Sequence, residues 1–170
     1  NLAKDSPLLF SDVRIINNRS PINKIRDRIR GLLGMTKIIL PKNPRLEISH
    51  HYGLENFYKY GIVLINVINH GYCKKLIIML PGQKHPAQFH KKKQESFFIL
   101  YGSVNLILDK RKFYLKTGDL KTIKKGQIHF FSTKTGAVIE ELSTTSVKSD
   151  SYYLDNKIVN NKNRKSFIYL

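Results

Sequence analysis

The sequence predicts a mainly β domain in which short antiparallel strands form a sandwich or a barrel. Apolar segments of strand length follow one another at short, regular spacing from residue 45 onward. Turn residues such as Gly102, Gly118 and Gly126 separate these segments. Many short strands without long intervening helices pack as antiparallel sandwiches or barrels.

Length and composition favour a single domain. The chain has 170 residues, of which 41% are hydrophobic, and this is enough for one sizeable core with short extensions. No run of eighteen apolar residues occurs, so we expect a soluble protein without a membrane span. The single cysteine, Cys73, excludes an internal disulfide and indicates a reducing, cytoplasmic environment in which this thiol is buried.

The net charge of +18 is spread along the chain and does not form clusters. Lysines lie in many separate turns, whereas nucleic-acid binding requires basic residues gathered on one surface. We therefore expect no nucleic-acid partner. A positive field of this kind favours small anionic ligands.

Residues 1–18 have no sustained periodicity, and we expect an arm or linker from a preceding domain, because the chain starts at Asn1. The domain itself is expected over 19–155, with a C-terminal tail at 156–170. It begins with an amphipathic helix that has Ser20 as N-cap, an apolar stripe with Ile25 and Ile29, and a stop signal at Gly34.

The strands are expected in order after this helix. Periodicity and turn signals predict them at 45–49, 62–68, 74–80, 95–101, 103–109, 112–116, 120–123, 128–132 and 137–143. A short helix is expected within 50–61 and a turn at 81–86. The last four residues are apolar and could add an edge strand.

A group of residues with metal-ligand chemistry stands out. Gln88 and His90 are two apart and share a strand face, whereas Glu95 requires a turn to join them. His129 lies on a later strand. If the strands close into a small barrel, these four side chains can converge inside it, with the lysines at 91–93 at its mouth.

Two stretches carry a family resemblance. Residues 82–102 resemble the first cupin motif, and residues 118–129 resemble the second, with His129 in register. The resemblance implies a cupin barrel, that is, a double-stranded β-helix or jelly roll.

Further stretches make the resemblance more specific. Residues 49–57, 72–86, 89–97, 133–145 and 150–155 look like the cupin region at the C-terminus of sialic acid synthase-like proteins. That region is itself similar to D-lyxose isomerases. The resemblance spans roughly residues 20–155, and residues 2–15 look like a linker to an antifreeze-like domain.

The resemblance implies a divalent metal ion held by Gln88, His90, Glu95 and His129. Gln88 departs from the family pattern, because an amide oxygen replaces an imidazole nitrogen. Affinity for Zn, Co, Ni or Fe should therefore fall, and harder ions are favoured. Ser146 is a second departure, since relatives usually have histidine there.

For an isomerase, a carboxylate would move a proton between adjacent sugar carbons while the metal polarises the oxygens. Glu140 or Glu141 could serve as the base, and at most one of them points inward, because adjacent residues of a strand face opposite ways. Glu141 is preferred because it alternates with Ile139, and Lys92 or Lys93, with Lys93 preferred, is the expected acid or electrostatic partner. Substrate contacts are expected from the residues His85, Lys92 and Glu140.

Two functions remain open at this point. The favoured one is a binding or accessory C-terminal domain of a sialic acid synthase-like protein in acidic-sugar or surface-polysaccharide biosynthesis. The alternative is a metal-dependent sugar isomerase or epimerase of D-lyxose isomerase type. Expected partners are a sugar or acidic sugar, a second copy in a homodimer, and a synthase domain in the same chain.

Overall fold

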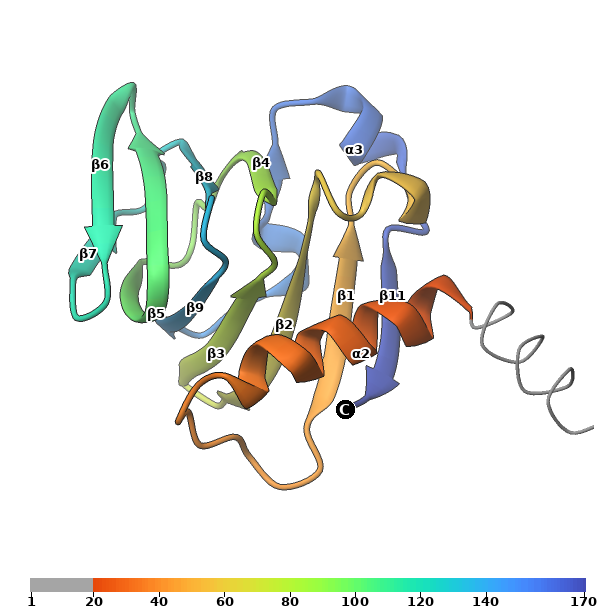
Figure 1. Cartoon of the computed structure of the whole chain (residues 1–170). Coiled ribbons are helices and arrows are strands. Elements are labelled where there is room, and N and C mark those ends of the chain that lie inside the picture. Colours follow the sequence, from red (N-terminus) through yellow and green to blue (C-terminus); the bar gives the residue numbers. More distant parts are fainter. Residues whose placement is uncertain (1–19) are drawn as a thin grey trace, which may run out of the picture.

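The computed structural model describes residues 20–170, so the arm expected at 1–18 lies outside the described residues. The fold is mainly β, and a single curled antiparallel sheet dominates it (Figure 1). The predicted cupin-type β fold is confirmed. Among the described residues, no helix combines the length and the apolar character that crossing a membrane requires.

The elements follow in chain order. The helices are α2 Pro21–Gly34 and α3 Asn156–Asn160, with the short 3₁₀ helices η1 Leu54–Asn56 and η2 Lys148–Asp150. The strands are β1 Arg45–His50, β2 Gly61–Asn69, β3 Tyr72–Met79, β4 Lys84–Phe89, β5 Glu95–Leu108, β6 Arg111–Lys116, β7 Leu120–Ile123, β8 His129–Ser132, β9 Ala137–Thr144, β10 Tyr152–Tyr153 and β11 Lys165–Tyr169.

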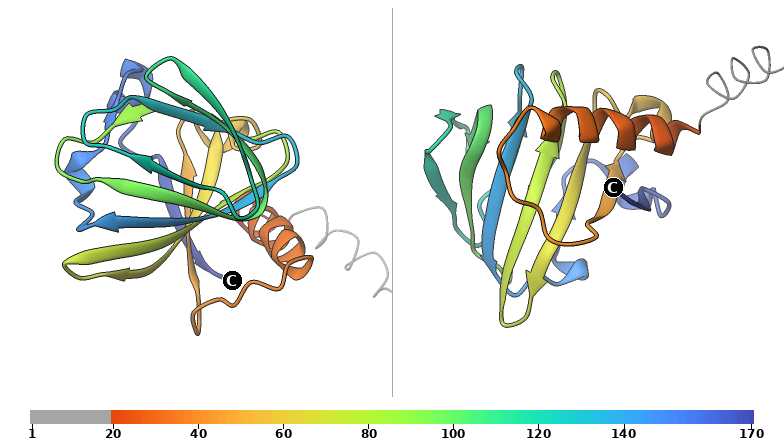
Figure 2. Two further views of the ribbon diagram at one scale, coloured as in Figure 1. Left: turned by 90° about the vertical axis from the view of Figure 1, so that its left-hand side faces the viewer. Right: turned by 60° about the horizontal axis from the view of Figure 1, so that its bottom comes forward.

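The strand order of the curled sheet places segments that are far apart in the sequence next to one another. The order is β10-β4-β8-β5-β9-β3-β2-β1-β11, and β6 and β7 both pair with β5. Viewed from the side in Figure 2, left, the strands surround a common interior. The strands of the two cupin-like motifs are neighbours in this sheet, because β4 and β5 of the first motif pair with β8 and β7 of the second.

Strand β5 serves both sides of the curl and bends at Gly102. The sequence predicted two strands, at 95–101 and 103–109, which in the structure are one continuous strand. Gly102 has φ +74°, and a Cβ there would overlap the carbonyl oxygen of Gly136. Only glycine allows both the left-handed backbone and this close approach.

The predicted helix is confirmed as α2. Ser20 caps it, because its side chain accepts a hydrogen bond from the amide of Asn23 at 3.3 Å. Its buried residues, including Ile25 and Ile29, pack on the outer face of β1, β2 and β3 against side chains such as Val63 (Figures 1 and 2). This apolar layer closes the outer side of the sheet.

A second apolar cluster fills part of the interior. Its members share full burial and come from seven strands: Ile62, Ile77, Met79, Phe97, Ile99, Val104, Leu106, Leu108, Leu115, Ile123, Phe131, Ala137 and Ile139. The remaining interior is lined largely by polar side chains and contains a cavity of about 340 Å³.

The last segment returns to the sheet. The final apolar residues form the edge strand β11, which pairs with β1, as the sequence suggested. Strand β10 pairs with β4, so the chain that follows β9 also reaches the other side of the interior.

Two local expectations differ from the structure. The helix expected within 50–61 is only the 3₁₀ turn η1, and β4 begins inside the stretch expected to be a turn. Strand β4 contains Pro86 and several polar residues, so it lacks an apolar strand pattern. Its pairing with β8 and β10 defines it instead.

Candidate active site

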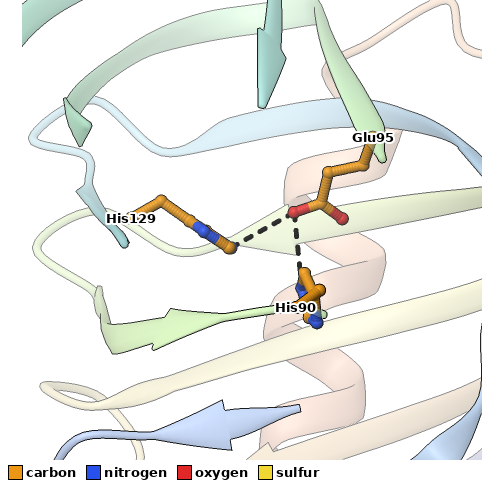
Figure 3. Close-up of side chains that lie close together, drawn as sticks. All are labelled: His90, Glu95 and His129. Carbon is orange, nitrogen blue, oxygen red and sulfur yellow. Dashed lines mark ion pairs between the residues drawn. The ribbon is translucent and has the colours of Figure 1, made fainter. Parts of the chain in front are cut away.

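Three strands and one turn bring the predicted metal ligands together. Gln88 on β4 lies opposite His129 on β8, and His90 follows directly after β4. Glu95 is the first residue of β5. In Figure 3 the side chains of His90, Glu95 and His129 point toward one another from these separate elements.

The cluster is compact and buried. Glu95 Oε1 lies 3.2 Å from His129 Nε2 and 3.5 Å from His90 Nε2 (Figure 3). Ligand atoms from these three residues all lie within 4.8 Å of one another. Each of the three side chains is at least 95% buried. Two imidazoles and a carboxylate at such distances suit a divalent transition metal.

The hydrogen bonds of the two imidazoles favour metal binding. His90 Nδ1 lies 2.8 Å from the carbonyl oxygen of Asp150, and His129 Nδ1 lies 3.1 Å from that of Gln127. A carbonyl can only accept, so in both rings Nδ1 carries a proton. Nε2 is therefore the atom of each ring that faces the Glu95 carboxylate. Without a cation, a protonated Nε2 can donate to this carboxylate; with a cation between them, the two Nε2 lone pairs and the carboxylate would be three electron donors around one centre.

Glu95 is ionised, as a metal ligand must be. Burial alone would raise its pKa, but hydrogen bonds with His129 and His90 and the charge of Lys93 hold the pKa well below its ordinary value. The carboxylate is therefore available to a cation at any physiological pH.

Gln88 lies beside the cluster. Its Nε2 atom is 3.4 Å from His129 Nε2, and its Oε1 atom is buried without a hydrogen-bond partner among the described residues. A buried amide oxygen without a partner is energetically costly. Coordination of a cation would satisfy it, so the side chain fits the position of a fourth, neutral ligand.

Lys93 and Glu141 adjoin the same cluster. Lys93 Nζ lies 3.0 Å from Glu95 Oε2 and 3.4 Å from Glu141 Oε2. Burial and the charge of Glu95 raise the pKa of Glu141 to about 7. Burial alone would lower the pKa of Lys93, but the carboxylates of Glu141 and Glu95 raise it, so the side chain stays an ammonium.

The other predicted site residues divide into two groups. His85 is buried, stacks on Phe131 with ring centroids 4.7 Å apart, and lines the cavity. Glu140 lies on the opposite face of β9, where it pairs with Lys74 at 3.6 Å. Lys92 is exposed. The structure does not bring Glu140 or Lys92 into the cavity wall.

The cavity wall also contains residues that the sequence did not single out. His51 Nε2 lies 3.2 Å from the hydroxyl oxygen of Tyr153, and both residues line the cavity together with Arg164 and Lys75. Burial, aided by the charges of Arg164 and Lys165, lowers the pKa of His51 to about 4. Tyr153 lies in the stretch 150–155 and His51 in the stretch 49–57, and the family resemblance of these two stretches was the available signal.

Ser146 occupies the second position that departs from the family pattern. Its hydroxyl oxygen accepts a hydrogen bond from Lys75 Nζ at 3.1 Å, and it lines the cavity away from the imidazole cluster. The loss of a histidine here therefore leaves the three buried ligands unchanged.

Comparison with known proteins finds a cupin domain and similar sugar isomerases. Residues 75–143 match the family model described as the cupin domain. The D-lyxose/D-mannose isomerase of Thermosediminibacter oceani is 24% identical, with 82% of this chain and 94% of that protein covered. The D-lyxose ketol-isomerase of a Thermofilum species is 26% identical, with 65% and 77% covered.

Solved structures of the same fold include two L-ribose isomerases. The enzyme of an Acinetobacter species, in complex with L-ribose, superposes with a TM-score of 0.69 at 13% identity, and 84% of this chain and 94% of that chain are covered. The Cellulomonas parahominis enzyme with L-psicose gives 0.69 at 14% identity, also with 84% and 94% covered.

These findings overturn one expectation from the sequence. The favoured function, an accessory domain of a sialic acid synthase-like protein, is wrong, because the relatives and structural neighbours are sugar isomerases. The chain also spans nearly the whole length of the Thermosediminibacter protein.

Proposed function

We propose that this chain, which carries a cupin domain, is a metal-dependent sugar isomerase that interconverts an aldose and a ketose. One observation carries the proposal: the His90, Glu95 and His129 cluster adjoins the Lys93 and Glu141 pair, and His90, Lys93 and Glu141 line one cavity. Ligands for a cation and a carboxylate of raised pKa are the two components that proton transfer next to a carbonyl requires.

The metal would be held by His90, Glu95 and His129, with the amide oxygen of Gln88 as a further ligand. A divalent cation, when bound, polarises the carbonyl oxygen and the neighbouring hydroxyl of the sugar. This ligand set does not select one metal, because an amide in place of an imidazole weakens the preference for softer ions.

Glu141 is the proposed base. It takes the proton from the carbon next to the sugar carbonyl and returns it to the former carbonyl carbon. The hydroxyl proton passes from the neighbouring oxygen to the former carbonyl oxygen, so that atoms and charge balance over the cycle. A base is most effective when its pKa lies near the working pH, and burial and the charge of Glu95 raise the pKa of Glu141 to about 7.

Lys93 has two proposed roles. Its ammonium lies 3.4 Å from Glu141 Oε2 and fixes the direction of that carboxylate. It also places a positive charge where a sugar oxygen becomes negative as the proton leaves, which lowers the energy of that state.

The cavity suits a small sugar. Its volume of about 340 Å³ lies at the lower end of the range for ligand pockets. His51, His85 and Tyr153 supply polar atoms and flat rings to its wall, and these groups bind hydroxyls and the apolar faces of sugars. We propose that they orient the substrate.

The charge of the wall favours a sugar with an anionic substituent, such as a phosphate or a carboxylate. The cavity wall contains more cationic than anionic side chains. Its carboxylates are Glu47 and Glu141, and its cations are Arg45, Lys75, Lys93, Lys148, Arg164 and Lys165. Lys165 pairs with Glu47, and Lys93 pairs with Glu141. Arg164 makes no ion pair with any carboxylate of the described part of the chain, so it is available to a ligand.

The direct test is exchange of the sugar proton. The protein, loaded with Mn²⁺ or Co²⁺, is incubated in D₂O with aldopentoses, aldohexoses and their phosphates, and NMR detects deuterium at C2 and ketose formation. We expect both for at least one sugar. If folded, metal-containing protein exchanges no proton of any of these sugars, the proposal is refuted.

The homodimer expected from the sequence remains part of the proposal by analogy with cupins. Light scattering coupled to gel filtration measures the mass directly. A mass near twice 19.7 kDa is expected.

A further inference from the structure

Asp150, which lies outside both cupin-like motifs, binds the turn that carries the lysines. This residue of η2 is 2% exposed. Its Oδ1 atom accepts hydrogen bonds from the amides of Lys91 at 3.0 Å and Lys92 at 3.1 Å. Its Oδ2 atom accepts from the amides of Lys92 at 3.0 Å and Lys93 at 3.1 Å. Three successive amides thus converge on one buried carboxylate, which holds the turn in a single shape.

The backbone of the same residue binds a proposed metal ligand. The Asp150 carbonyl oxygen lies 2.8 Å from His90 Nδ1, across a separation of 60 residues in the chain. This contact keeps a proton on Nδ1 and makes Nε2 the ring atom that faces Glu95. Outer partners of this kind fix the tautomer and the orientation of metal-binding histidines.

Two proposed site residues therefore depend on one buried aspartate. The turn that Asp150 binds begins directly after His90 and ends at Lys93, whose ammonium lies 3.0 Å from Glu95 Oε2. If the carboxylate is removed, the three amides lose their acceptor. The backbone from which the His90 and Lys93 side chains extend is then no longer held in one conformation.

We infer that Asp150 is a positioning residue that sets the geometry of the metal centre through His90 and Lys93. The inference rests on the proposed function for the metal, but its structural basis is the set of hydrogen bonds above. The competing explanation is that Asp150 only anchors a surface turn. In that case its loss lowers stability and leaves the ligand geometry unchanged.

The test compares Asp150→Asn and Asp150→Ala with Asp119→Asn as the matched control. Asp119 also accepts a backbone hydrogen bond in a turn, from the amide of Lys116 at 2.7 Å, but that turn is exposed and remote from the cluster. Co²⁺ affinity is measured by competition with a chelator on folded protein. We expect a 10- to 100-fold loss for Asp150→Ala and a smaller loss for Asp150→Asn, which keeps one acceptor oxygen. Asp119→Asn should stay within about twofold of wild type, because the loss is expected only where an outer partner of a ligand is removed.

A second readout does not need a metal. Nitrogen-15 NMR of the His90 ring in metal-free protein should show an Nδ1 atom that is always protonated in wild type, whereas in the Asp150 variants some rings should lack the Nδ1 proton. If wild type binds no Co²⁺, the metal part of the proposed function fails, and the tautomer of His90 still decides the role of Asp150. Unchanged Co²⁺ affinity together with an unchanged tautomer would overturn the inference. If Asp150→Ala does not fold, Asp150→Asn carries both measurements.

Discussion

Gln88 and His129 face each other across β4 and β8, with 3.4 Å between their Nε2 atoms. An amide thus stands where an imidazole would complete the set of nitrogen ligands. Gln88→His should raise Co²⁺ affinity at least about tenfold, because imidazole is a stronger ligand than amide for this class of ion. Competition titration measures it.

The control for this change is Gln94→His, since Gln94 is exposed and next to Glu95 in the chain. Equal Co²⁺ affinity for wild type and Gln88→His would mean that Gln88 does not reach the metal.

Glu140 and Glu141 provide a matched pair on β9. Glu141 contacts Lys93 on the inner face, whereas Glu140 pairs with Lys74 on the outer face. Glu141→Gln should lower kcat by a factor of about 10² to 10⁴, the usual contribution of a general base. Glu140→Gln should leave kcat within about threefold of wild type, because it removes no such base. A similar loss in both variants would count against Glu141 as the base.

Arg164 is the residue that tests the charge of the sugar. Its Nη1 atom is held by the carbonyl oxygens of Asn161 at 3.0 Å and Ile158 at 3.3 Å, so the guanidinium has a defined position. Arg164→Gln should raise the KM for an aldose phosphate about tenfold, as expected for the loss of one charged hydrogen bond. The KM for the matching neutral aldose should change little.

Arg111→Gln, which changes an exposed arginine, controls for the general charge of the protein. If wild type prefers the neutral aldose, or if both KM values rise equally, the anionic sugar is the wrong substrate class.

Stability should fall in mild acid because of buried histidines. Burial lowers the pKa of His51 from 6.5 to about 4, and burial also holds the pKa of His85 well below 6.5. Between pH 4 and pH 6.5 the unfolded chain binds more protons than the folded chain. The stabilisation present above pH 6.5 is therefore lost as the pH falls toward 4. Each such histidine contributes a slope of about 1.4 kcal/mol per pH unit.

Urea denaturation at pH 7, 6 and 5 measures this slope. His51→Gln should reduce it by the share of one histidine, and replacement of the exposed His70 by glutamine should leave it unchanged. A slope that His51→Gln does not alter would show that His51 is not the group responsible.

The bend in β5 gives a prediction about the free energy of unfolding. Gly102 and Gly71 have nearly equal φ values, +74° and +72°, but only at Gly102 would a Cβ meet another backbone atom. Gly71→Ala should cost about 1–2 kcal/mol for the left-handed conformation alone. Gly102→Ala should cost at least about 1–3 kcal/mol more, because the clash with Gly136 requires a backbone shift. Equal losses in urea denaturation would mean that the strand can move away.

The fold class could be read from the sequence because its signals are local. Ser20, Pro21 and the apolar stripe of α2 lie within a few turns of one helix, and strand alternation repeats every two residues. The motif spacing also placed His90, Glu95 and His129 in one interior. Alternation showed that only one of Glu140 and Glu141 can point inward, and the contacts of the structure identify Glu141.

The tertiary structure decided what surrounds these ligands. Asp150 meets His90 across 60 residues, and His51 meets Tyr153 across 102 residues. Such contacts depend on how the sheet curls and on where the tail returns, and no local pattern in the chain encodes either. Lys92 and Lys93 illustrate the same limit: they are adjacent and identical in type, yet Lys92 is exposed and Lys93 is buried against Glu95. By itself, the sequence determined the mainly β fold class, because periodicity and turn signals are local, and its resemblance to cupins supplied the candidate ligands. The charge and polar partners of the site were decided only when distant segments packed together, because burial and hydrogen bonding arise between them.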